Sequence, residues 1–133
     1  MGRDGFLLGI DVGTTNTKVA VYDFEGKRMA FASFRTPLVE SPYGENYPPG
    51  KIFESLLKVI KNFDIALRKR IVALSVSSFA EVMVSIDAQG TVIGDCIPWY
   101  DTRTEEQFKK MQNLLDPQRV YQITGLLPQN KYS

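Results

Sequence analysis

The chain has 133 residues and a mass of 15.0 kDa, which is the size of one domain. Hydrophobic residues make up 44% and charged residues 23%, a globular composition that argues against disorder. The net charge of +1 gives no electrostatic case for a nucleic-acid partner or an anionic membrane. Because the sequence has no histidine and one cysteine, Cys96, it excludes Ser-His-Asp and Cys-His catalysis and any zinc site built from those residues.

Any metal bound by this chain must therefore be held by oxygen ligands. The single cysteine favours a reducing compartment. No apolar run reaches the length of a membrane-spanning helix, and the short apolar stretch near the start is interrupted by Asp11, unlike a signal peptide. We expect a cytoplasmic protein with no membrane partner.

In chain order, the first elements are three strands. Residues 6–12 form an apolar run between two glycines, which is typical of a buried strand. Residues 17–24 are rich in Val, Thr and Tyr, and residues 28–35 follow after a turn at 25–27. Connections this short predict antiparallel neighbours.

Residues 36–50 predict a loop because they contain several prolines and glycines. A helix is predicted over residues 51–70, where apolar side chains recur at three- and four-residue steps. Residues 71–77 read as another buried strand. Because this strand follows a helix, we expect it to lie parallel to an earlier strand through a right-handed crossover.

The last third predicts a hairpin and two helices. Residues 82–87 and 91–97 flank a turn and have the composition of paired strands. A capping-box pattern at Thr104 predicts a helix to about residue 115. A second short helix can begin at Pro117 and end near Gly125. The whole pattern is a mixed α/β architecture.

The sharpest chemical signal is the turn between the first two strands. Gly13 allows the backbone to approach a bulky anion, and Thr14 and Thr15 offer hydroxyls beside amides that can point into one concavity. Lys18 supplies a positive charge. Asp11 would repel phosphate unless a cation, normally hydrated Mg²⁺, lies between them. The alternative is an ordinary polar hairpin turn capped by the aspartate.

The sequence Asp-x-Gly-Thr-Thr at 11–15 resembles the first phosphate motif of the actin, hexokinase and Hsp70 ATPase superfamily; no Walker A loop is present. Residues 77–90, followed by the Trp-x-Asp-x-Arg segment within 98–103, resemble the FGGY carbohydrate kinases, where a strand, a sugar-contacting elbow, a hairpin and this segment occur in the same order. A Thr-Gly segment at 123–126 extends the resemblance to nearly the whole chain.

The resemblance implies an α/β fold of the ribonuclease H-like, actin-like ATPase kind. Its mixed sheet would have three antiparallel strands, a crossover helix and a parallel strand, with an inserted hairpin and C-terminal helices. The implied cofactors are ATP and Mg²⁺. Asp11 would sit near the metal, through water, while the β- and γ-phosphates would be lined by Gly13, Thr14, Thr15 and Lys18.

The resemblance also implies a sugar or polyol substrate, at positions matched by Ala80, Glu81, Trp99, Asp101, Arg103 and Tyr132. Glu81 aligns with an acidic residue of glycerol kinases and a histidine of xylulose kinases, whereas Ala80 matches neither group, so no single sugar is indicated. Structural alternatives stay open. Trp99 could be core, Glu81 a solvated turn residue, and Asp101 and Arg103 could pair to fix the loop, which we favour over direct substrate contact.

FGGY kinases are considerably longer, with two actin-like domains around a cleft. Their general-base aspartate, second phosphate motif and adenosine motif would follow residue 133. We therefore expect residues 1–133 to be an N-terminal actin-like domain, truncated at its C-terminal end and inactive alone. The longer protein would transfer the γ-phosphate of ATP to a sugar hydroxyl. Surface left uncovered would favour contact with the rest of the kinase chain or a homodimer.

Two other interpretations were weighed. A non-enzymatic actin-like module would bind ATP or assemble without phosphorylating anything, but it has no need of the polyol-pocket residues around Glu81 and Trp99. A ribonuclease H-like nuclease would need acidic metal ligands on adjacent strands. Residues 71–77 offer no carboxylate, which counts against that interpretation.

Overall fold

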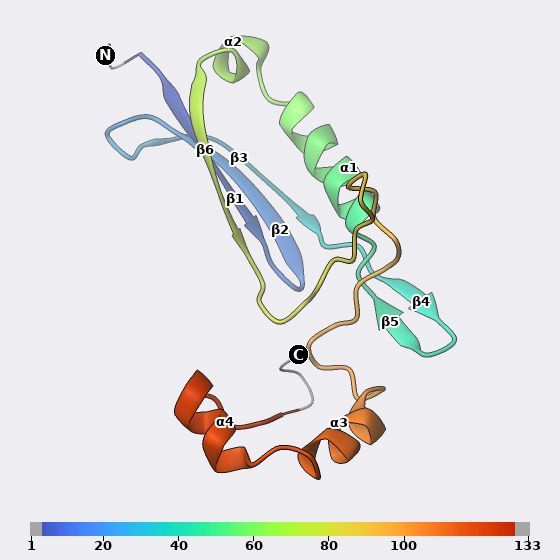
Figure 1. Ribbon diagram of the computed structural model, residues 1–133. Coiled ribbons are helices and arrows are strands. Elements are labelled where there is room, and N and C mark those ends of the chain that lie inside the picture. Colours follow the sequence, from blue (N-terminus) through green and yellow to red (C-terminus); the bar gives the residue numbers. More distant parts are fainter. Residues whose placement is uncertain (1–3, 130–133) are drawn as a thin grey trace.

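The computed structural model describes residues 4–129, and a twisted four-stranded sheet lies at one end of it, opposite the last two helices (Figure 1). The spatial strand order is β3-β2-β1-β6. Neighbours in the β1–β2 and β2–β3 pairs run antiparallel, whereas β6 runs parallel to β1. The mixed sheet predicted from the sequence is confirmed. Its strands are β1 (Phe6–Val12), β2 (Asn16–Tyr22), β3 (Arg28–Arg35) and β6 (Ile71–Ser78).

The predicted loop over residues 36–50 is wrong in part, because it contains a small second sheet. Strands β4 (Val39–Ser41) and β5 (Gly44–Asn46) pair antiparallel as a short hairpin. The prolines stand before, between and after these strands rather than inside them, so they leave the pairing intact.

The single helix predicted over residues 51–70 is also wrong, since the structure divides it into α1 (Pro49–Lys61) and α2 (Ile65–Arg68). Between them, the Asp64 side chain accepts hydrogen bonds from two amides of the next turn, at 2.7 and 3.2 Å. A side chain bonded in this way caps a new helix. The apolar spacing runs on across the break, which is why periodicity alone did not reveal it.

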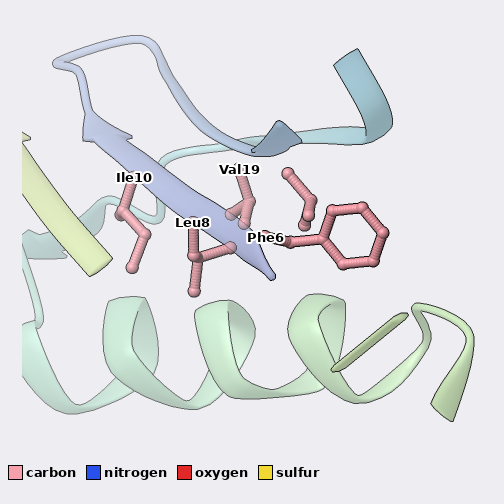
Figure 2. Packing of buried hydrophobic residues seen from close by; sticks show 5 residues of the cluster. Phe6, Leu8, Ile10 and Val19 are labelled. Carbon is pink, nitrogen blue, oxygen red and sulfur yellow. The ribbon is translucent and has the colours of Figure 1, made fainter. Parts of the chain in front are cut away.

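The core lies between α1 and one face of the sheet (Figure 2). Alternate residues of β1 point toward the helix, as the two-residue period of a strand requires. The buried side chains are Phe6, Leu8 and Ile10 of β1 with Val19 and Val21 of β2. Leu56, Val59 and Ile60 of α1 pack against this cluster from the other side.

Strand β6 is predicted as buried, but in this structure it is an exposed edge strand. Leu74 and Val76 pair in register with Leu8 and Ile10, so they share the face that α1 covers farther along the sheet. Even so, Leu74 is 64% exposed and Val76 56% exposed. The hydrophobic composition of β6 therefore indicates a strand that is suited to burial. The described residues cover only part of its surface.

The hairpin predicted over residues 82–97 is wrong as a pair of strands. Its turn does form, because the Asp87 amide donates to the Thr91 carbonyl at 2.9 Å, and one isolated bridge joins Ile86 to Val92. A two-stranded hairpin needs a third strand or a packed face for stability. Met83 and Ile93 are 68% and 66% exposed, so no packed face supports this one.

Two short helices follow, α3 (Glu105–Gln112) and α4 (Pro117–Thr124), away from the sheet (Figure 1). Thr104 is the N-cap of α3, but its side chain makes no capping hydrogen bond, so the predicted capping box is not formed. Gly125 ends α4 in the left-handed conformation, as predicted. Within residues 4–129, no helix is long and apolar enough to cross a membrane.

Candidate functional site

The turn between β1 and β2 brings the backbone unusually close to itself at Gly13. The Gly13 amide donates to the Asn16 carbonyl oxygen at 3.2 Å. A Cβ atom at residue 13 would lie 2.6 Å from that oxygen, which is too close for any side chain. Glycine is therefore required here by contact within the turn, and the adjoining Thr14 and Thr15 form its tip.

Opposite charges face each other at the base of this turn. Asp11 and Lys18 are direct partners in the β1–β2 register, and the Lys18 Nζ atom lies 3.3 Å from Asp11 Oδ2. Their side chains are 48% and 53% exposed, so both remain accessible to a ligand. The sequence-based prediction that a carboxylate and an ammonium flank the turn agrees with this geometry.

The donor set at the turn suits magnesium better than a metal that needs a full protein cage. Among residues 4–129, no group of three or more acidic, cysteine or histidine side chains could hold a metal ion. Mg²⁺ keeps several of its waters and is commonly bound through one or two carboxylates together with substrate phosphates. One half-exposed carboxylate, Asp11, at the base of the turn meets that requirement.

The turn and the Trp99 segment meet at a cavity of about 180 Å³, although they are far apart in sequence. Trp99 is 40% exposed and lies edge-on to Tyr100, with ring centroids 5.7 Å apart. The Trp99 indole is therefore not part of the core formed by residues 4–129. The cavity is lined by Thr14, Thr15, Arg35, Thr36, Leu38, Tyr47, Trp99 and Tyr100.

Asp101 and Arg103 form a two-pronged ion pair, as the structural alternative for these residues predicted. Arg103 Nη2 donates to Asp101 Oδ2 at 2.7 Å, and Arg103 Nε donates to Oδ1 at 2.8 Å. These hydrogen bonds hold the pKa of Asp101 below its ordinary value. Arg103 Nη2 also donates to the Glu45 carbonyl oxygen at 3.0 Å. The pair therefore fastens the Trp99 segment to β5.

Tyr100 makes a second attachment to β5. Its hydroxyl donates to Glu45 Oε2 at 3.2 Å. Burial, followed by the neighbouring Tyr47 and Glu45, raises the pKa of Tyr100 to about 12. The Tyr100 hydroxyl therefore stays protonated at neutral pH and acts as a hydrogen-bond donor.

Glu81 lies in the elbow after β6 and has a backbone conformation that favours glycine. Its φ angle is +63°. Among residues 4–129, Glu81 is the one residue other than glycine with a positive φ angle. Such strained positions are concentrated at functional sites. The Phe79 amide donates to the Val12 carbonyl at 2.9 Å, which ties the elbow to the end of β1. Because β6 is parallel to β1, Glu81 and the exposed Ala80 lie at the sheet end that carries the turn between β1 and β2.

Tyr132, the remaining predicted substrate residue, lies outside the described residues. A larger cavity of about 430 Å³ lies between α1 and the chain after β6. Its lining is almost entirely apolar and includes Phe53, Phe79, Val84 and Cys96, so it offers a polyol few hydrogen-bond partners.

The sequence did not indicate the buried residues that support the turn between β1 and β2. Thr17 and Thr36 are 0% and 2% exposed, and their Oγ1 atoms lie 3.0 Å apart. Tyr47 is 2% exposed and packs its ring against Phe79, with centroids 4.8 Å apart. No local motif marks these residues, since their partners are 19 or more positions away in sequence.

The profile of the FGGY family of carbohydrate kinases, N-terminal domain, matches residues 6–133. The chain belongs to this family. Its sequence is 30% identical over 125 residues to a gluconokinase of Bacillus subtilis, an alignment that covers 90% of this chain and 24% of the gluconokinase. The chain thus spans about a quarter of the length of the curated relatives it matches.

Solved structures of a xylulose kinase and a glycerol kinase share the fold. A ligand-bound xylulose kinase from Lactobacillus acidophilus superimposes with a TM-score of 0.72 and 26% identity, over 89% of this chain and 24% of that one. A Plasmodium falciparum glycerol kinase with ADP superimposes with a TM-score of 0.80 and 21% identity, over 100% of this chain and 28% of that one. At this identity, the second likeness shows the fold alone.

Proposed function

We propose that the chain is the N-terminal actin-like domain of a longer ATP-dependent carbohydrate kinase, which transfers the γ-phosphate of ATP to a sugar hydroxyl in the cytoplasm. One observation carries the proposal. The glycine-dependent turn, flanked by Asp11 and Lys18, lies at the same end of the sheet as the strained Glu81 elbow, and Trp99 reaches that turn. A phosphate site and a polyol site must be adjacent for direct transfer.

In this proposal the turn holds the β- and γ-phosphates. Gly13 allows close approach, the amides and hydroxyls of Thr14 and Thr15 donate, and Lys18 offsets negative charge. Asp11 would hold Mg²⁺ through water. When bound, that ion neutralises charge on the phosphate oxygens as the γ-phosphoryl group is transferred. The half-exposed Asp11–Lys18 pair fits these roles because both groups are accessible yet already in place.

The sugar-binding roles fall on the segments after β6. The Trp99 indole would cover the carbon skeleton of the sugar, while the Glu81 carboxylate accepts hydrogen bonds from its hydroxyls beside Ala80. Asp101 and Arg103 would act mainly by fixing the Trp99 segment, since their side chains bond to each other. Tyr132 would complete the pocket.

The sugar itself is proposed only as a small polyhydroxylated compound. The relatives are named for gluconate, glycerol and xylulose, which are three different substrates. Membership of the family therefore supports a class of substrate but not an individual compound. We assign no general base to this chain. In the proposal, the base that accepts the sugar hydroxyl proton belongs to the part of the longer protein that follows, and the chain alone is inactive.

The test is ADP formation by the full-length protein with ATP, Mg²⁺ and each of gluconate, glycerol and xylulose. We expect turnover with at least one of these three compounds and none from the isolated chain. Gly13→Ala should lower kcat/KM by about 100-fold, because an added Cβ displaces the turn. Gly50→Ala is the matched control, since no atom lies within 4 Å of its added Cβ. Absence of turnover with a wide sugar panel, or full activity of Gly13→Ala, would contradict the proposal.

A further inference from the structure

The proposed phosphate turn consists of residues 13–15. Its three successive carbonyl groups accept hydrogen bonds from buried residues that are distant in sequence. The Gly13 carbonyl accepts from Thr36 Oγ1 at 2.6 Å, and the Thr15 carbonyl accepts from the Thr36 amide at 2.9 Å. Between them, the Thr14 carbonyl accepts from the Tyr47 hydroxyl at 3.3 Å. Two residues, Thr36 and Tyr47, therefore engage every carbonyl of the segment 13–15.

These donors are buried, and the hydrogen bonds of the Thr36 hydroxyl have a fixed direction. Thr36 and Tyr47 are each 2% exposed. A hydroxyl has a single hydrogen to donate, and Thr36 Oγ1 gives it to Gly13, so Thr36 must accept from the Thr17 hydroxyl 3.0 Å away. The order Thr17 to Thr36 to Gly13 is a chain of hydrogen bonds in a buried environment, where each bond strengthens the next.

Fixed carbonyls also fix the amides of the turn. In a trans peptide, the carbonyl of one residue and the amide of the next point in opposite directions. Carbonyls of residues 13–15 that face Thr36 and Tyr47 direct the amides of Thr14, Thr15 and Asn16 away from them. Thr15 and Asn16 are exposed residues, so a ligand can approach them. A carbonyl rotated toward the ligand would repel a phosphate oxygen, whereas amides attract it.

We propose that Thr36 and Tyr47 are positioning residues for the phosphate site, which hold the turn carbonyls back so that the turn amides stay directed at the phosphates of ATP. This rests on the proposed function, since it concerns the same ATP site. Their contribution is preorganisation: the amides need no reorientation when the nucleotide binds. In this proposal both residues act through residues 13–15, whose carbonyls they bind.

The test is steady-state kinetics of the full-length kinase with three variants. Thr36→Val keeps the shape and removes the hydroxyl, Thr36→Ser keeps the hydroxyl, and Tyr47→Phe keeps the ring that packs on Phe79. We expect the KM for ATP to rise about tenfold in Thr36→Val and about threefold in Tyr47→Phe, with the KM for the sugar within about twofold. Thr36→Ser should restore a KM for ATP close to that of the wild type.

Val21→Ala separates positioning from stability. Val21 is fully buried near the far end of β2, so this variant should lower the melting temperature without changing the KM for ATP. If Thr36→Val does not fold, Tyr47→Phe decides. An active wild type whose Thr36→Val and Tyr47→Phe variants keep its KM for ATP would overturn the positioning role alone. A wild type without ATP-dependent activity on any sugar would overturn the proposed function, and the positioning role with it.

Discussion

The residues up to the end of β6 and the residues after it are held in place by different means. Residues 6–78 contain the packed core between α1 and the sheet. Residues 79–129 contain two helices without a single buried residue. That second region is attached at a few points, including the paired backbone bonds of Tyr47 and Cys96, at 2.8 Å each, and the contact of Arg103 with Glu45.

This difference shows that the hydrophobic core determines the geometry of only one half of the candidate site. The turn between β1 and β2 joins two core strands and is supported by buried hydroxyls, so its geometry follows from the packing of the sheet. The chain after β6 instead depends on hydrogen bonds and on the Asp101–Arg103 ion pair, while Ile93 and Leu114 are 66% and 84% exposed. In the longer kinase that we propose, further chain would cover such surface.

The largest expected effect comes from making one substitution in both regions. Leu8 is 6% exposed in the core and Leu114 is 84% exposed in the second region. Leu8→Ala should lower the free energy of unfolding by about 2–5 kcal/mol, because it leaves a cavity, whereas Leu114→Ala should change it by less than about 0.5 kcal/mol. Urea denaturation followed by circular dichroism measures both. Equal losses would show that the second region is packed as firmly as the first.

An intermediate effect is expected where the two regions are joined, at the Asp101–Arg103 pair. The Arg103 amide donates to Asp101 Oδ1 at 2.8 Å, so its hydrogen exchange reports the pair directly. Asp101→Asn weakens charge-assisted hydrogen bonds and should speed this exchange about tenfold at pH 7. Exchange of amides in β1 should not change, and equal acceleration there would contradict a local role.

The same pair predicts a pH dependence. Because the pKa of Asp101 is lowered in the folded protein, its stabilising contribution is complete above the ordinary aspartate pKa of about 3.9. The contribution is lost as the pH falls through the lowered folded value. The difference in Arg103 exchange between wild type and Asp101→Asn, corrected for intrinsic rates, should therefore shrink below about pH 4. A constant difference down to lower pH would contradict the ion pair as its cause.

The smallest effect on folding is expected at Lys18, within the well-packed region. Its ion pair with Asp11 is about half exposed, so Lys18→Met should change the unfolding free energy by less than about 1 kcal/mol. In the full-length kinase, the same variant should raise the KM for ATP about tenfold or more, since a charge next to phosphate is lost. A large loss of stability with unchanged kinetics would make Lys18 structural.

The strands of the sheet could be predicted because each carries its own signal. The apolar run of β1 between two glycines and the turn before β3 are local patterns, and both strands have the predicted bounds. The exposure of Leu74 could not be predicted, because composition shows that a strand is suited to burial but not whether the described chain covers it. The break before α2 was hidden for a similar reason, since the apolar spacing continues across it.

The candidate site divides in the same way. Gly13, Asp11 and Lys18 could be named from the sequence because they surround one tight turn, whereas the ion pair between Asp11 and Lys18 is seen only in the structure. Thr36 and Tyr47 could not be named, because a threonine after a strand and a tyrosine in a proline-rich stretch have ordinary sequence contexts. Only the fold brings their donors to the carbonyls of the turn.

The buried Cys96 is a natural reporter of how residues after β6 separate from the region before it. It is 4% exposed, and it is the single cysteine of the sequence. Burial, with the nearby Asp95, raises the pKa of its thiol, so little reactive thiolate is present while the backbone bridge to Tyr47 is closed. The rate at which a thiol-specific reagent alkylates the native protein therefore reports how often that bridge opens. The natural cysteine serves as the probe, so no engineered label is needed.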